Sequence, residues 1–331
     1  MAKLLLNADG KVLTSNDKVL KAPEVDTSSE DGLIDGSLTT YSNDRVTSIR
    51  NYAFYYSNLT EISLPNVTSV GNYAFYSCKS LTDVYAPLVT SVGNNAFQYC
   101  ETLTKISLPK VTTLNKNTFS SCYRLIEVEF PNLTSIDGKS VFSSCKALTK
   151  VSVPNLVIIA GGTFSSCEAL KQLYLPKLKS VEEQATSFCK NLIELLIPSV
   201  IEIKENAFAS CYSLKKIYIE QTDSICTLKN VTAFTFCYHI LGTVNSTYNP
   251  NGDKDGYIYV PASRLAEYKI STNWAEHSSQ IIGHQDFNVG DTLPDYTTSD
   301  FTTQTWYSDE TLTTVVTSVA TAGKYYCRLE A

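Results

Sequence analysis

The sequence predicts an α/β solenoid, in which each coil contributes one short parallel strand and one short helical turn. Three observations support this fold class: a cysteine that recurs about every 22 residues, a phenylalanine three residues before it, and, in most copies, a proline nine residues after it. A period of about 20 to 50 residues is typical of repeat architectures, so the repeat determines the whole fold. Successive cysteines are 22, 22, 23, 22, 22, 22 and 26 residues apart. They are Cys78, Cys100, Cys122, Cys145, Cys167, Cys189, Cys211 and Cys237.

The phenylalanine is position zero of each repeat, and apolar residues recur at plus 6, plus 9, plus 11, plus 14 and plus 17. Positions plus 9 and plus 11 predict the inward face of a strand, because side chains alternate across a strand. The proline at plus 12 ends that strand, since it has no N–H group for the sheet. The spacing of Phe97, Cys100 and Leu103 favours a helical or 3₁₀ turn on the opposite wall. Thr186 replaces the phenylalanine once, and we expect Phe188 to compensate.

The cysteine column predicts a ladder of buried, inert thiols with a structural role. Zinc sites need paired ligands such as Cys-x-x-Cys, and the chain has none. Stacked coils bring neighbouring Cα atoms to about 5 Å, within disulfide range, but parallel Cβ vectors disfavour the bond. A free cysteine also packs as a small apolar residue. Cys226 and Cys327 lie outside the register, and nothing in the sequence supports a bond between them.

The repeat text resembles a known family. Residues 95–109 read NAFQYCETLTKISLP and resemble the BspA-like, or treponemal-type, leucine-rich repeat family. The resemblance covers roughly Thr39 to Ile282, with eight or nine copies in register. It implies a leucine-rich repeat solenoid whose last coil is shielded by a C-terminal cap. It also implies a bacterial surface protein that binds host proteins, including those of the extracellular matrix.

We expect three parts along the chain. Residues 1–32 form an N-terminal β-hairpin segment and a polar linker, with strands at Lys3–Leu6, Lys11–Leu13 and Lys18–Leu20. Residues 33–284 form the solenoid with its caps, the C-terminal cap being 257–284, with a helical stretch from Ala262 to Ile270. Residues 285–331 form a small all-β domain. The first residues lack the apolar region of a signal peptide, and no run of about 18 apolar residues predicts a membrane span.

Composition disfavours nucleic acid and catalysis. The net charge is −6, without the clustered Lys and Arg that nucleic-acid binding needs. The chain has only three histidines and none of the common nucleophile, zinc-protease or phosphate-loop motifs. We therefore expect no enzyme activity and no cofactor. Asn251, Asp253 and Asp255 match half of a calcium loop, but Ala262 stands where a bidentate Glu is required, so a tight acidic turn is the favoured interpretation.

The exposed strand face gives the candidate binding residues. Position plus 10 carries Tyr85, Tyr174, Leu196 and Tyr218, and Tyr259 follows in the terminal strand. Position plus 8 alternates in charge between neighbouring strands. Tyrosine is amphipathic and common in binding surfaces, where it stacks on sugar rings or anchors a protein. Two alternatives remain open: the terminal domain covers the row, or tyrosine is present for its strand propensity alone.

These observations predict a non-enzymatic recognition or adhesion protein whose solenoid binds a protein or carbohydrate on a host or bacterial surface. We expect neither nucleic acid as a partner nor insertion into a membrane. One alternative is a bacteriophage virion component, in the tail or as a decoration protein, which needs no export signal. Another is a structural spacer without a ligand. The sequence leaves the localisation unknown, and the family resemblance suggests a bacterial cell surface or a phage particle.

Overall fold

The computed structural model consists of two compact units, residues 1–170 and 171–331, and each is described by itself. Within the predicted N-terminal segment, β1 (Val12–Leu13) pairs antiparallel with β2 (Val19–Leu20), as expected for two of the three strands. The third, Lys3–Leu6, lies outside the described residues. The structure describes residues 12–13, 19–20, 39–221, 223–241, 247, 251–287, 303–308, 312, 314–317 and 323–330.

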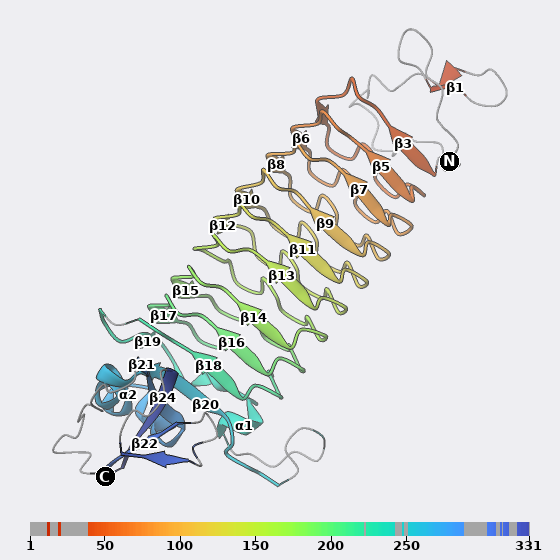
Figure 1. Cartoon of the computed structure of the whole chain (residues 1–331). Helices are drawn as coiled ribbons and strands as arrows, with labels where there is room; N and C mark the ends of the chain where they lie inside the picture. The colour runs from red at the N-terminus through yellow and green to blue at the C-terminus, as the bar shows by residue number, and fades with distance from the viewer. Residues whose placement is uncertain are drawn as a thin grey trace. The chain divides into compact units, whose positions relative to one another are not determined.

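Unit 1 is a solenoid in which each coil from β3 to β12 carries two short strands, and equivalent strands of successive coils lie side by side (Figure 1). The coil of β13 carries one strand, and its second wall makes a single bridge from Ile158 to Ser135. The pairs are parallel and in repeat register, for example Val128 of β11 opposite Ile106 of β9. The first wall holds β3 (Thr40–Ser42), β5 (Glu61–Ser63), β7 (Asp83–Tyr85), β9 (Lys105–Ser107), β11 (Glu127–Glu129) and β13 (Lys150–Ser152). The second wall holds β4 (Ser48–Ile49), β6 (Ser69–Val70), β8 (Ser91–Val92), β10 (Thr113–Leu114) and β12 (Ser135–Ile136).

The third side of each coil, here called the turn wall, carries consecutive turns in place of the predicted helical turn. Positions minus 2 and plus 2 have positive φ, such as 58° at Asn95 and 60° at Tyr99. These two residues, one on each side of Phe97, have a left-handed conformation that stops the backbone from continuing as a helix. The N–H of position zero instead donates to the next coil, as Phe75 does to the Ala96 carbonyl at 2.7 Å. The solenoid is confirmed, and the turn wall is its third ladder of hydrogen bonds between coils.

The core of unit 1 is a column of stacked phenylalanine rings with the cysteines and leucines packed around it. The rings at position zero lie 4.9 to 5.6 Å apart with planes within 10° of parallel, from Phe54 to Phe164. Full burial of one such side chain contributes roughly 1.5 to 3 kcal/mol. A single coil leaves this edge exposed, so the coils are stable only as a stack.

Unit 2 continues the same coil pattern. Its first-wall strands are β14 (Gln172–Tyr174), β16 (Glu194–Leu196), β18 (Lys216–Tyr218) and β20 (Tyr257–Pro261). Its second wall holds β15 (Ser180–Val181), β17 (Glu202–Ile203) and β19 (Thr227–Leu228). Thr186 at position zero is 1% exposed and its hydroxyl donates to the Ala207 carbonyl at 3.3 Å. Phe188 is 47% exposed, so the expectation that it replaces the missing ring is wrong.

The last coil is closed by short helices and by a strand that pairs with β20. The predicted helical stretch from Ala262 to Ile270 is present as η2 (Ala262–Arg264) and α2 (Leu265–Ile270). Trp274 is buried, and its indole N–H donates to the Cys226 carbonyl at 2.7 Å. The remaining elements are η1 (Val231–Phe234), α1 (Tyr238–Leu241), η3 (Ala275–Gln280) and β21 (Ile281–Phe287).

The C-terminal strands extend the first-wall sheet of unit 2. β24 (Gly323–Glu330) pairs antiparallel with β21, and β22 (Thr303–Tyr307) and β23 (Val315–Val316) follow, giving the order β14-β16-β18-β20-β21-β24-β22-β23 (Figure 1). β21 runs across the boundary expected after residue 284. The three-part division of the chain stays a prediction. In the parts of the chain described, none of the helices has the length and hydrophobicity needed to cross a bilayer.

Candidate functional site

The residues predicted for the strand face of unit 2 form one row across four strands. Tyr174 pairs with Leu196, Leu196 with Tyr218, and Tyr218 with Tyr259. This strand row is most open at Tyr174, which is 55% exposed, and Leu196 and Tyr218 are half-buried. The row therefore offers a ligand aromatic and aliphatic surface on β14, β16 and β18.

Tyr259, at the end of the row, is only 1% exposed, which corrects its prediction as a binding residue. Its ring stacks on Tyr218 at 4.7 Å and meets the edge of Tyr326 at 5.7 Å. Tyr326 belongs to β24, which pairs with β21 and closes over this end of the sheet. The alternative of intramolecular cover therefore applies to Tyr259. Tyr218 stays partly accessible, and the Lys324 ammonium lies 5.9 Å from the centroid of the Tyr218 ring.

Tyr85, the remaining predicted strand-face residue, belongs to unit 1. It lies at the end of β7 in register with Ser63 of β5 and is 59% exposed. The equivalent residue of β9 is Ser107. Tyr85 is thus an exposed aromatic ring whose equivalents in the neighbouring coils are serines.

A second aromatic surface, on the turn wall of unit 1, was missed by the sequence analysis. Tyr52 stacks on Tyr73 at 5.0 Å, and Tyr55 stacks on Tyr76 at 5.2 Å. Tyr52 and Tyr56 are 48% and 59% exposed. We call this group the tyrosine cluster, and its members are Tyr52, Tyr55, Tyr56, Tyr73, Tyr76 and Tyr99.

Several members of the tyrosine cluster occupy backbone positions that disfavour aromatic side chains. Tyr52 and Tyr56 have φ of 60° and 56°. A left-handed conformation costs about 1 to 2 kcal/mol for an L-residue, and asparagine tolerates it better. The same two slots hold asparagine at 95, 117 and 206 and serine at 77, 121, 144, 166 and 210. The tyrosines beside the core phenylalanine can be read in the NYAFYYS and NYAFYSC segments. Only the structure shows that some of them occupy left-handed positions, which are unfavourable for an aromatic residue.

The cysteine column is buried and its thiols hold neighbouring coils together. All ten cysteines are buried and none forms a disulfide, so Cys226 and Cys327 are not bonded to each other. The Cys122 thiol donates to the carbonyl of Phe97 in the preceding coil at 3.1 Å. Burial raises its pKa to about 12. The same thiol-to-carbonyl contact, at 2.9 to 3.2 Å, is made by Cys78, Cys100, Cys145, Cys167, Cys211 and Cys237.

The candidate calcium residues do not form a ligand set. The Asp255 carboxylate accepts hydrogen bonds from the Lys215 ammonium at 2.6 Å and from His239 at 2.5 Å. Burial alone would raise the pKa of Asp255, but these two partners lower it below its ordinary value. Asn251 donates to Asp253 at 3.4 Å. No group of three or more His, Cys, Asp or Glu suited to a metal occurs within the described ranges.

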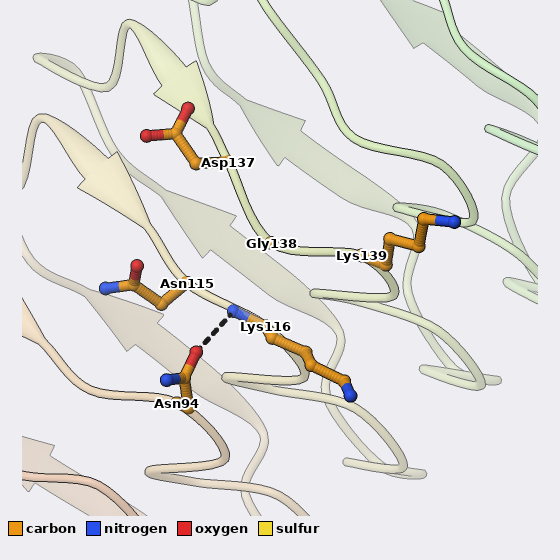
Figure 2. Close-up of a pocket in the computed structure, with 6 residues that line it drawn as sticks. All are labelled: Asn94, Asn115, Lys116, Asp137, Gly138 and Lys139. Carbon is orange, nitrogen blue, oxygen red and sulfur yellow. Dashed lines mark hydrogen bonds between the residues drawn. The ribbon is translucent and has the colours of Figure 1, made fainter.

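A hollow of about 340 Å³ lies beside the second wall of unit 1 (Figure 2). It is lined by Asn94, Asn115, Lys116, Asp137, Gly138 and Lys139. A Cβ atom at Gly138 would lie 1.8 Å from the backbone nitrogen of Lys116, so only glycine allows this approach between coils. The Asp137 carboxylate and the two lysine ammonium groups point away from one another (Figure 2). The hollow thus has no convergent polar groups, and the 23-residue step from Cys122 to Cys145 accounts for it.

Comparison with known proteins identifies the class of the chain. Residues 47–159 and 134–249 match the BspA type leucine rich repeat region, in six copies. The chain therefore belongs to the BspA-type leucine-rich repeat family, as the repeat text predicts. At the level of sequence, no protein of curated function matches it.

Solved structures of similar repeat proteins come from several bacteria. A leucine-rich repeat protein of T. pallidum is 31% identical over 50% of this chain and 82% of its own, with a TM-score of 0.46. A leucine rich cell surface protein of Faecalibacterium prausnitzii A2-165 is 20% identical over 78% and 86%, with a TM-score of 0.38. The pneumococcal vaccine antigen PcpA is 16% identical over 71% and 69%, with a TM-score of 0.42.

Proposed function

We propose that this protein is a non-enzymatic recognition or adhesion protein that binds a protein or glycan on a cell surface. The observation that carries the proposal is the tyrosine cluster. Exposed aromatic rings gather there at left-handed positions where other coils use asparagine and serine. An unfavourable backbone conformation retained on an exposed surface favours a functional role. Tyrosine supplies a rigid, amphipathic contact area to a binding partner.

The strand row of Tyr174, Leu196 and Tyr218 is the second surface in the proposal. Its three residues lie on adjacent strands in register and keep exposed or half-exposed side chains. Polar and charged residues flank it at position plus 8, where the Gln172 amide donates to the Glu194 carboxylate. An aromatic centre with a polar border is typical of a protein interface.

The histidines support a function without catalysis. His277 and His284 are buried, and burial lowers the pKa of each to about 4. His239 is bound by Asp255, and the described part of the chain places no serine or cysteine side chain in hydrogen-bonding contact with it. A general base activating a nucleophile needs such a contact.

The test measures binding of the full chain to an array of host glycoproteins, matrix proteins and bacterial wall polysaccharides. One variant combines Tyr52→Asn with Tyr56→Ser, and a second is Tyr174→Ser. Each substitution introduces the residue found in the same slot of another coil, so folding is preserved. Tyr123→Ser, on a tyrosine that is 37% exposed outside both surfaces, is the matched control.

Loss of binding in the double variant alone identifies the tyrosine cluster as the adhesive surface, and loss in Tyr174→Ser alone identifies the strand row. Equal binding by the wild-type protein and all three variants contradicts both surfaces. Absence of any binding by the wild-type protein contradicts the adhesive function and favours the structural spacer.

A further inference from the structure

A second pocket, of about 360 Å³, lies at the capped end of unit 2. It is formed where η1 and α1 meet η3. Its walls are partly apolar and aromatic, with Glu276 contributing a carboxylate. The lining residues are Val231, Thr232, Thr235, Phe236, Tyr238, Leu241, Glu276 and His277. Its volume lies in the range of small-molecule sites, about 300 to 1,000 Å³.

Two buried polar atoms in this pocket lack partners. The Thr232 Oγ1 and His277 Nε2 atoms make no hydrogen bond to any part of the chain that the structure describes. His277 is 4% exposed, and its ring packs edge-on against Phe234 at 4.8 Å. A buried polar atom without a partner costs about 1 to 3 kcal/mol, so native structures rarely leave one unpaired. Thr232 and His277 both line this pocket, so a group bound there is the candidate partner for the missing hydrogen bonds.

The chemistry of the two atoms favours hydroxyl groups as their partners. Burial, with a smaller contribution from Lys254, lowers the pKa of His277 to about 4, so the imidazole is neutral near pH 7. A neutral imidazole nitrogen either donates or accepts, depending on the tautomer. A ligand hydroxyl both donates and accepts, so it pairs with either tautomer and with the Thr232 hydroxyl. A carboxylate such as Glu276 accepts further hydroxyl donors.

The aromatic walls favour a ring with an apolar face. Phe236 is 55% exposed at φ 59°, a left-handed slot that serine occupies in five other coils. The rings of Phe236 and Tyr238 are 6.5 Å apart, and both line the pocket. The C–H face of a sugar ring packs against such rings while its hydroxyls point outward. We propose that this pocket binds a neutral pyranose, held by Phe236 and Tyr238 through its C–H face and by Thr232, His277 and Glu276 through its hydroxyls.

The test titrates the full chain with glucose, galactose, mannose and N-acetylglucosamine, using saturation-transfer NMR and calorimetry. At least one sugar binds, and it shifts the His277 ring protons. Phe236→Ser and Thr232→Val each weaken that binding tenfold or more. Phe188→Ser is the matched control, because Phe188 occupies the same left-handed slot in another coil and does not line the pocket.

Either of two results overturns the proposal: no transfer to any of the four sugars at about 10 mM, or equal weakening in Phe188→Ser. Sugar binding in this pocket does not depend on the tyrosine cluster or on the strand row. The Tyr52→Asn, Tyr56→Ser double variant retains sugar binding even if it loses adhesion, and a failure of adhesion leaves this pocket unaffected.

Discussion

At the scale of the residue, left-handed backbone positions explain why particular side chains are unexpected. The coils from Phe54 to Phe208 have one such position on either side of position zero, and the last coil has one, at Phe236. Asparagine, serine and glycine fill most of these positions from residue 117 onward. Aromatic residues fill them at Tyr52, Tyr56, Tyr73, Tyr99, Phe188 and Phe236. Aromatic residues at these positions therefore have a conformational cost that the fold does not require, and this cost can be measured.

Phe188→Asn is expected to raise the free energy of unfolding of unit 2 by about 0.5 to 1 kcal/mol, because asparagine accepts positive φ more readily. Phe188 is 47% exposed, so little packing is lost. Urea denaturation measures the change. Tyr174→Asn is the control, since Tyr174 is similarly exposed but lies on a strand, and no gain is expected there. A loss of stability in Phe188→Asn would contradict the role given to the backbone.

At the scale of the element, the cap is joined to the last coil through both backbone polar groups of Cys226. The Cys226 N–H donates to the Tyr268 hydroxyl of α2 at 2.7 Å, and the Cys226 carbonyl accepts from Trp274. All of these groups are buried. The second wall of the solenoid is therefore connected to the cap by hydrogen bonds as well as by apolar packing.

Tyr268→Phe removes the acceptor of the buried Cys226 N–H and keeps the ring. The expected loss is about 1 to 3 kcal/mol in the stability of unit 2, because a buried donor is left unpaired. Thermal unfolding measures this loss. Tyr174→Phe, on an exposed ring, is expected to change the midpoint little. An equal effect of the two variants would show that the Tyr268 hydroxyl does not connect the cap to the coil.

The sequence predicted the first-wall strands, because proline and the alternation at plus 9 and plus 11 specify a strand locally. It did not predict the turn wall. A spacing of three between Phe97, Cys100 and Leu103 suits a helical turn and two successive turns equally well. The local sequence pattern also could not predict the burial of Tyr259. Tyr326 lies far along the chain and contacts Tyr259 only because β24 pairs with β21. The pocket beside η3 likewise joins residues about 40 positions apart.

At the scale of the whole molecule, the repeated cysteine makes stability depend on pH in the alkaline range. A buried thiol whose pKa is raised stays protonated in the folded chain, while the unfolded chain loses that proton above the ordinary value of 9.0. Unfolding then releases protons, so stability is complete below pH 9 and falls as the pH rises. Burial raises the pKa of Cys100, Cys122 and Cys145 in unit 1 and of Cys211, Cys226 and Cys237 in unit 2, whereas a hydrogen bond with Cys100 lowers the pKa of Cys78.

Each of these thiols with a raised pKa is expected to lower the free energy of unfolding of its unit by about 1.4 kcal/mol per pH unit above pH 9. Urea unfolding at pH 8, 9 and 10 measures the slope. In Cys122→Ala the slope of unit 1 is expected to fall by about 1.4 kcal/mol per pH unit, which separates the thiols from the tyrosines. An unchanged slope in this variant would show that the thiols are not its cause.

The thiol-to-carbonyl contacts also give the stack a direction. Each coil receives a hydrogen bond from its successor and gives one to its predecessor, with the same donor and the same acceptor every time. A duplicated 22-residue copy inserted between two coils would donate its thiol to the carbonyl of the preceding coil. Its own carbonyl would accept the thiol of the following coil. Unequal recombination within the coding sequence can therefore lengthen or shorten the protein by one coil at a time. Natural variants are expected to differ by whole coils.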